Sequence, residues 1–179
     1  MRLFLLTLAA AACLVGDDGP KFTPDGRLLK PEVYREWVWL SSGLGMSYGP
    51  ATPSNAATDP PFDNAFVNRS AYREFLRTGT WPDQTMFVLE VRRSQSKGSI
   101  NQGGHFQGDL VAIEAEVKNK KWMFYGFEGS AASAKPIPAT ASCYSCHAEH
   151  GAVDNTFVQF YPTLIEIARQ KGTFREEKR

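Results

Sequence analysis

Alternating apolar and polar positions run through the middle of the chain and predict strands of an antiparallel sheet. Residues 85–92 alternate with a period of two, so that Phe87 and Leu89 share one face of the predicted strand. Residues 109–118 alternate as well, with one entirely apolar face. Glu114 lies on their opposite face, which we expect to be solvated.

Other segments complete the predicted secondary structure. Further strands are predicted at residues 37–40, 64–67 and 121–127. Helices are predicted at residues 31–36, 69–77 and 164–168. Residues 41–61, rich in Gly, Ser, Pro, Ala and Asn, predict a long loop. The result is an α+β fold, mainly antiparallel sheet with a few flanking helices, and not a four-helix bundle, which needs long helices with a period near 3.6.

The first twenty residues are typical of an export signal. Arg2 precedes a short apolar run that ends in small residues, and Asp17 follows too soon for a membrane-spanning helix. Cys13 is either the lipidated cysteine of a lipoprotein signal or a residue of a discarded signal peptide. We therefore expect residues 21–179 to form a single domain in the periplasm or another extracytoplasmic space, with a lipid anchor at Cys13 left open and no membrane span.

Composition changes this picture little. The 179 residues include 20 basic and 19 acidic side chains, a formal net charge of +1. A nearly balanced charge gives no reason to expect a nucleic-acid partner. The length is ordinary for one domain and allows a core and a bound cofactor.

The motif Cys143-Tyr-Ser-Cys146-His147 carries the most specific chemistry. This order of residues is typical of covalent attachment of one haem c, with two thioether bonds and the histidine as an iron ligand. A redox dithiol, half of a zinc site and a short-range disulfide share the Cys-x-x-Cys spacing. Cys13, the third cysteine, is far away in the sequence. Export favours the haem interpretation over the other three.

The chain resembles the cytochrome P460 and cytochrome c′-β family in the order and approximate spacing of many residues. The matching positions are Tyr34-Arg-Glu-Trp-Val38, Phe66-Val67, Tyr72, Thr78-Gly79, Trp81-Pro-Asp83, Glu90, Gly108-Asp109, Glu114, Val117-Lys118, Trp122, Phe124-Tyr125, the haem motif, Asp154 and Phe160-Tyr161-Pro162. The resemblance implies a mainly antiparallel β fold, a homodimer, one haem c per chain and an iron face open to small ligands.

Two departures from the family pattern bear on function. Enzymes of the P460 type oxidise hydroxylamine and carry a lysine cross-linked to the haem edge, but Leu89 stands at the matching position. Their distal arginine falls near Asp63 or Asn64. Both changes disfavour hydroxylamine oxidation and indicate the c′-β branch, whose members bind nitric oxide or carbon monoxide.

Several side chains are candidates for the haem pocket. Leu89, Phe87, Phe62 and Phe106 are candidates for its apolar wall, although each could equally be a core residue. Met46, in the long loop, and His105 are candidate sixth iron ligands. Tyr161 is expected to be structural, because a buried tyrosine hydroxyl usually finds a structural partner.

Three functions follow from these alternatives. The first is a mono-haem c protein that binds a small gas such as nitric oxide at an open iron face. The second is an electron-transfer cytochrome with Met46 or His105 as sixth ligand. The third is an oxidoreductase acting on hydroxylamine or peroxide. The sequence does not identify catalytic residues or a redox partner.

Overall fold

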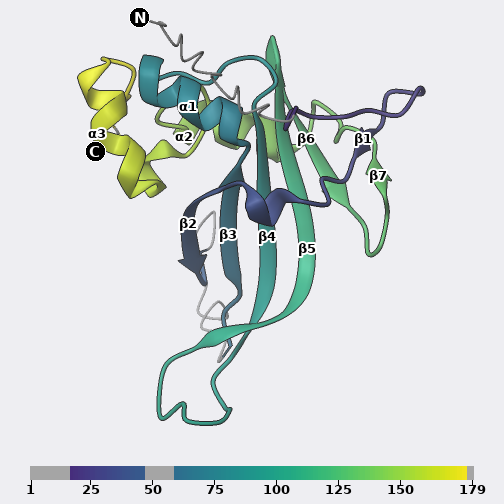
Figure 1. The fold of residues 1–179 in the computed structure, drawn as a ribbon, viewed down its shortest axis with the longest axis vertical. Helices are drawn as coiled ribbons and strands as arrows, with labels where there is room; N and C mark the ends of the chain where they lie inside the picture. Colours follow the sequence, from purple (N-terminus) through teal and green to yellow (C-terminus); the bar gives the residue numbers. More distant parts are fainter. Residues whose placement is uncertain (1–16, 47–58, 177–179) are drawn as a thin grey trace, which may run out of the picture.

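A five-stranded antiparallel sheet forms the frame of the molecule in the computed structural model, which describes residues 17–46 and 59–176. Its strands are β2 (Val38–Leu44), β3 (Phe62–Val67), β4 (Met86–Gln95), β5 (Phe106–Asn119) and β6 (Lys121–Phe127), and they lie side by side in that order. Figure 1 shows that β4 and β5 extend beyond their neighbours as a long hairpin. The predicted α+β fold with a mainly antiparallel sheet is confirmed.

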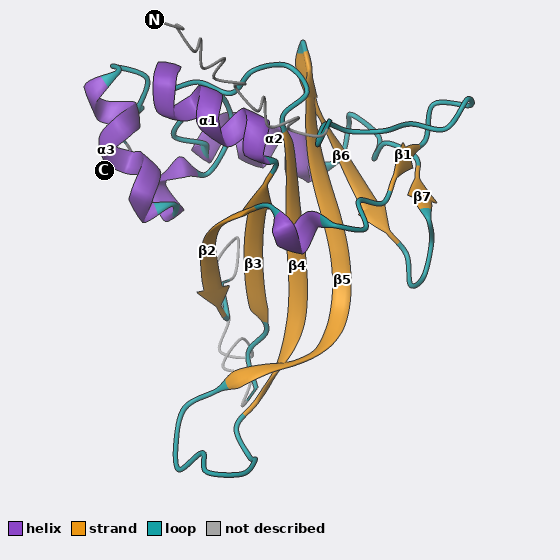
Figure 2. Ribbon diagram, viewed as in Figure 1, coloured by secondary structure: helices purple, strands orange, loops and turns teal. Residues whose placement is uncertain are grey.

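Short helices gather around the end of the sheet opposite to the tip of this hairpin (Figure 2). They are α1 (Arg69–Thr78), α2 (Ser142–His150) and α3 (Pro162–Gln170), with the single 3₁₀ turn η3 (Val158–Phe160). A second 3₁₀ turn, η1 (Tyr34–Glu36), crosses the middle of the sheet. A two-stranded ribbon of β1 (Leu28–Leu29) and β7 (Ser133–Ala134) lies beside β6. This is not a helical bundle.

Local sequence explains the limits of α1. The helix begins after Asn68 as predicted, although the Asn68 side chain does not cap it and instead accepts a hydrogen bond from the backbone N–H of Met86 at 2.9 Å. Gly79 ends the helix in the left-handed conformation, with a φ of 76°. A Cβ on Gly79 would come within 2.6 Å of the Lys171 Cβ, so the end of α1 also packs closely against the C-terminal segment.

Three local expectations differ from the structure. The helix expected at residues 31–36 is only the 3₁₀ turn η1. The strand expected at residues 37–40 continues to Leu44, because Ser and Gly residues after Leu40 still pair with β3. The haem motif lies on a helix, α2, that no periodicity predicted. Residues 47–58 of the expected loop, and residues 1–16 with Cys13, lie outside the described residues.

Alternation along the strands gives the sheet two apolar faces. On one face, Val67, Phe87 and Trp122 pack with Phe75 of α1 and Leu164 of α3. This core holds the helices against the sheet and leaves the residues farther along β3, β4 and β5 uncovered by α1 and α3. The haem motif approaches the sheet on this face, since Cys143 packs against the same core.

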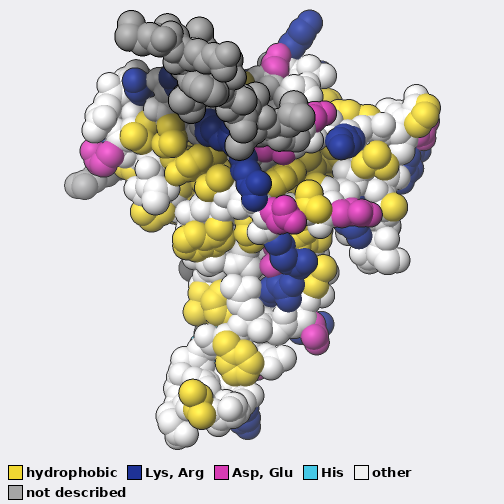
Figure 3. Space-filling view, in the orientation of Figure 1, with side chains coloured by type: hydrophobic (Ala, Val, Ile, Leu, Met, Phe, Trp, Pro, Cys, Tyr) yellow, Lys and Arg dark blue, Asp and Glu magenta, His cyan; other side chains and the backbone are white. Residues whose placement is uncertain are grey.

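The opposite face has a separate core and a buried charge. Its apolar residues include Met86, Val88, Ile113, Ala115, Val117 and Tyr125. Glu90, 3% exposed, accepts hydrogen bonds from Tyr34 and Arg35 of η1 and, at 2.6 Å, from Arg92. Figure 3 shows dark-blue basic and magenta acidic side chains next to one another in the middle of the face that η1 crosses.

Hydrogen bonding keeps Glu90 ionised despite its burial. Burial by itself would raise the pKa of Glu90, but the hydrogen bonds from Arg92, Tyr34 and Arg35 outweigh it and lower the pKa to about 2. The network thereby ties η1 to the sheet.

Within residues 17–46 and 59–176, no helix is both long enough and apolar enough to cross a membrane.

Candidate haem site

The helix α2 brings the three residues of the haem motif to one side. Cys143, Cys146 and His147 occupy positions i, i+3 and i+4, which are neighbours on a helix surface. Both cysteines carry free thiols and are partly exposed. None of the residues of α2 is fully buried, although Cys143 and Tyr144 pack against the core.

The His147 ring is held in a defined orientation. Its Nδ1 lies 3.0 Å from the carbonyl oxygen of Asn155. Donation of the Nδ1 proton to this carbonyl fixes the tautomer in which Nε2 carries the lone pair, as required of an iron ligand. Phe124 and Phe157 pack on the ring, with centroids at 4.6 Å and 4.3 Å.

A tight turn after α2 supplies the Asn155 carbonyl. Asp154 and Asn155 both adopt positive φ angles, 48° and 61°, which Asp and Asn tolerate better than most residues. Gly151 is required for close approach, because a Cβ there would lie 2.5 Å from the Asn155 carbonyl carbon and 2.7 Å from the His147 carbonyl oxygen. Sequence reasoning missed this turn, although Gly151 and the Asp154-Asn155 pair were its visible signal.

Glu116 also lies close to the His147 Nδ1, with its Oε1 at 3.4 Å. Burial raises the pKa of Glu116 and outweighs the opposing effect of the histidine. Burial would lower the pKa of His147, but Glu116 and the Asn155 carbonyl outweigh it and raise that pKa above its usual value. Both shifts favour keeping a proton on the pair.

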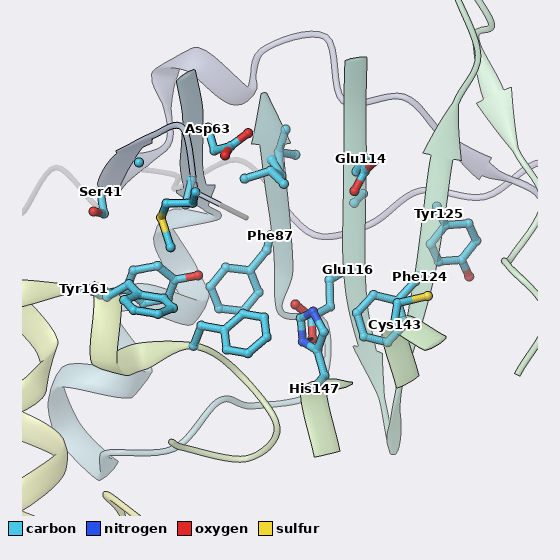
Figure 4. Close-up of a pocket in the computed structure, with 18 of the residues that line it drawn as sticks. Ser41, Asp63, Phe87, Glu114, Glu116, Phe124, Tyr125, Cys143, His147 and Tyr161 are labelled. Atoms are coloured by element: carbon cyan, nitrogen blue, oxygen red, sulfur yellow. Dashed lines mark ion pairs between the residues drawn. The ribbon is translucent and has the colours of Figure 1, made fainter. Parts of the chain in front are cut away.

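A cavity of about 320 Å³ opens between the sheet, α2 and the segment around η3. Its wall is mainly apolar and includes the side chains of Ala65, Phe87, Leu89, Phe124, Ile137, Phe157 and Phe160. Figure 4 shows the side chains of Phe87, Tyr161, Glu116 and His147 extending from their elements toward this space. We refer to it as the haem-site cavity.

Six of the residues expected at the site line this cavity: Cys143, His147, Leu89, Phe87, Asp63 and Met46. Met46 follows the end of β2, and its Sδ occupies the space where a Cβ on Gly43 would stand, 2.4 Å away. Tyr161 and Glu114, for which we expected a structural role and a solvated face, also lie on the cavity wall. Glu114 nevertheless has an exposed side chain.

The structure does not bring the other candidates to this cavity, and Cys146, although it lies on α2, is not among the lining residues. Neighbouring residues of a strand point to opposite faces, so Phe62 and Asn64 lie on the face opposite to Asp63. The Asn64 amide donates instead to Gln107 at 2.7 Å, as part of the hydrogen-bond network around Glu90. Phe106 and His105 belong to the far hairpin, which is too distant in the fold to reach α2.

Several lining residues were missed from the sequence. Ser41 and Ala65 are small and carry no signal of their own, and Phe124, Phe157 and Phe160 were not among the residues expected at the site. Strand pairing is what identifies Ala65, because it lies directly opposite Leu89 in the β3–β4 ladder. A side chain beside Leu89 on the same face necessarily belongs to the same wall.

The residues present fit a haem c better than the alternatives to it. A zinc site needs further ligands, and the part of the chain that the structure describes contains no cluster of three His, Cys, Asp or Glu residues able to hold a metal ion. A haem needs one oriented imidazole, two thiols on the same helix face and a largely apolar cavity. All three features meet at α2.

Comparison with known proteins agrees with this geometry. A family model described as Cytochrome P460 matches residues 31–158, which is over two thirds of the chain. The match includes β2 to β6 and the whole of α2. No curated protein matches the chain significantly. The chain therefore belongs to the cytochrome P460 family, whose cofactor is haem.

Proposed function

We propose that this protein is an extracytoplasmic cytochrome with one covalently attached haem c, and that it binds a small uncharged gas such as nitric oxide or carbon monoxide at the iron. The observation that carries the proposal is the pairing of an oriented His147 with a mainly apolar cavity. An apolar pocket admits neutral diatomic molecules and gives little help to reactions that must create charge.

Covalent attachment rests on Cys143 and Cys146. Each thiol would add across one haem vinyl group, so that a carbon–sulfur bond forms and the thiol proton moves to the neighbouring vinyl carbon. Mass spectrometry of the denatured protein should find one haem per chain. The Cys143→Ser, Cys146→Ser double variant should lose its haem on denaturation, and haem retained by this variant would contradict the attachment.

Gas binding is tested by optical and resonance Raman spectra of the ferrous protein. We expect a five-coordinate high-spin haem that converts to a new species when nitric oxide is added. A low-spin six-coordinate spectrum that does not change with gas would contradict the proposal.

Leu89 makes hydroxylamine oxidation a poor fit. Leucine has no nucleophilic nitrogen, and no lysine lines the described part of the haem-site cavity. We expect a haem without a cross-link to the protein beyond the two thioethers, and no steady-state oxidation of hydroxylamine. Steady-state oxidation of hydroxylamine, together with an additional covalent modification of the haem, would contradict this expectation and support the enzymatic function.

Electron transfer is a second candidate, because Met46 lies in the cavity. Its thioether could complete a His–Met coordinated iron, which favours electron transfer over ligand binding. In that case Met46→Ala should convert a low-spin spectrum to a high-spin one. Met123→Ala is the matched control, because Met123 packs against the core on the other face of the sheet. A wild-type protein that is already high-spin eliminates this candidate.

Location and assembly complete the proposal. We propose that residues 1–20 direct export, that the mature protein works in the periplasm, with a lipid anchor at Cys13 as the alternative to full release, and that it forms a homodimer. Cell fractionation, mass analysis of the mature N-terminus and light scattering test these three statements separately.

A further inference from the structure

We propose that Asp63 and Glu114 form an anionic wall that makes the haem-site cavity select uncharged ligands over anions. This inference rests on the proposed function and names the ligand class that the site rejects. Anions such as azide and nitrite should bind the iron weakly, whereas carbon monoxide and nitric oxide should not be affected.

Strand pairing places the two carboxylates on one face. Leu89 of β4 lies directly between Ala65 of β3 and Glu114 of β5. Asp63 is two residues from Ala65 on the same strand, so its side chain points to the same face of the sheet. Figure 4 shows Asp63 and Glu114 on the two strands that flank β4. Both residues line the haem-site cavity.

The charge of Glu114 acts on Asp63, and no basic residue of the described cavity wall compensates the two carboxylates. Burial raises the pKa of Asp63, and the charge of Glu114 raises it further. No Lys or Arg lies among the described residues that line the cavity. By contrast, the charge of Glu90 on the opposite face of the sheet is compensated by Arg35 and Arg92.

An uncompensated pair of carboxylates in a partly buried wall is costly to stability, and such groups concentrate at functional sites. Their effect on a ligand depends on its charge. An anion entering the cavity is repelled by both carboxylates, of which Asp63 is partly buried and Glu114 exposed, while a neutral diatomic molecule experiences almost no such force. The Glu116 carboxylate lies beside His147 and belongs to that pair instead.

Ligand affinities of the haem-loaded protein test the proposal at pH 8. We expect Asp63→Asn and Glu114→Gln each to tighten azide binding to the ferric protein about tenfold, which corresponds to about 1.4 kcal/mol. The double variant should gain about a hundredfold. The affinity of the ferrous variants for carbon monoxide should stay within about twofold of wild type.

Two controls make the test specific. Glu128→Gln removes one exposed carboxylate just after β6, outside the cavity, and should leave azide affinity unchanged. In wild-type protein, added salt should tighten azide binding, because it screens the repulsion, and this needs no variant to fold.

The outcomes separate the two proposals. Azide affinities that are equal in wild type and in the double variant, or that do not change with salt in wild type, would overturn the anionic wall. Equal tightening of carbon monoxide and azide would also overturn it, because removal of charge cannot favour a neutral ligand. Failure of the wild-type protein to bind any gas would instead contradict the proposed function. In that case the comparison of azide affinities between wild type and variants would still test the anionic wall.

Discussion

Gly151 determines how the proximal histidine is held. Its φ is −65°, so its importance comes from close packing and not from a left-handed backbone. A Cβ at this position would overlap the backbone of Asn155, whose carbonyl accepts the His147 Nδ1 proton. The hydrogen bond that orients the iron ligand therefore depends on a residue with no side chain.

We predict that Gly151→Ala displaces this carbonyl and weakens the proximal hydrogen bond. Its free energy of unfolding should fall by about 1–3 kcal/mol, the usual cost of overpacking. The iron–histidine stretching band in the ferrous resonance Raman spectrum should shift to lower frequency. Gly103→Ala is the control, because a Cβ there meets nothing within 4 Å. An unchanged band in Gly151→Ala would contradict the role of this turn.

At the scale of elements, we infer that α2 depends on the cofactor for part of its stability. None of its residues is fully buried, although Cys143 and Tyr144 pack against the core, whereas α1 buries Ala71 and Phe75. We predict that amide hydrogens of α2 exchange quickly in haem-free protein and become protected after haem attachment. Those of α1 should be protected in both forms. Equal protection of α2 without haem, measured by hydrogen exchange with mass spectrometry, would contradict this.

The same feature explains which elements could be predicted from the sequence. The strands β4, β5 and β6 were predicted because protein covers both faces of the sheet and imposes alternation on Phe87, Val88 and Leu89. The helix α2 could not be predicted from periodicity, because it has no fully buried residue and so needs no continuous apolar stripe. The end of β2 was also missed, because Ser41, Ser42 and Gly43 are typical of loops.

Only the residues of the site that belong to a sequence motif or to the family pattern could be predicted from the sequence. Cys143 and His147 belong to a short motif, and Leu89 was found by resemblance to a family. Phe62 was placed at the site from sequence proximity alone, yet the register of β3 turns it to the other face. Which residues share a wall depends on pairing between strands, and one sequence without a structure does not contain that pairing.

At the scale of the whole molecule, stability in acid depends on Glu90. Its pKa is about 2 in the folded protein, well below the ordinary value of 4.5. A lowered carboxyl pKa contributes stability above the unfolded value, and this contribution is lost as the pH falls through the folded value. The molecule should therefore lose up to about 3 kcal/mol of stability between about pH 4.5 and pH 2.

We predict that Glu90→Gln lowers the free energy of unfolding at pH 7 by about 3 kcal/mol, because it leaves the Arg92 charge half-buried without its partner. The variant should also lose much of the acid dependence between pH 4.5 and pH 2. Urea unfolding across this pH range measures both effects. Glu128→Gln, at an exposed position, should change stability by less than about 0.5 kcal/mol. An acid dependence identical to wild type would contradict the assignment to Glu90.

The two faces of β5 have a consequence for how such a protein changes over generations. Ile113, Ala115 and Val117 hold the core of one face, while Glu114 and Glu116 point to the cofactor side. Mutations of the core residues Ile113, Ala115 and Val117 lower the stability of the fold. Mutations of Glu114 and Glu116 alter mainly the chemistry next to the iron. Selection can therefore change what the cavity accepts, one residue at a time, without first having to rebuild the scaffold.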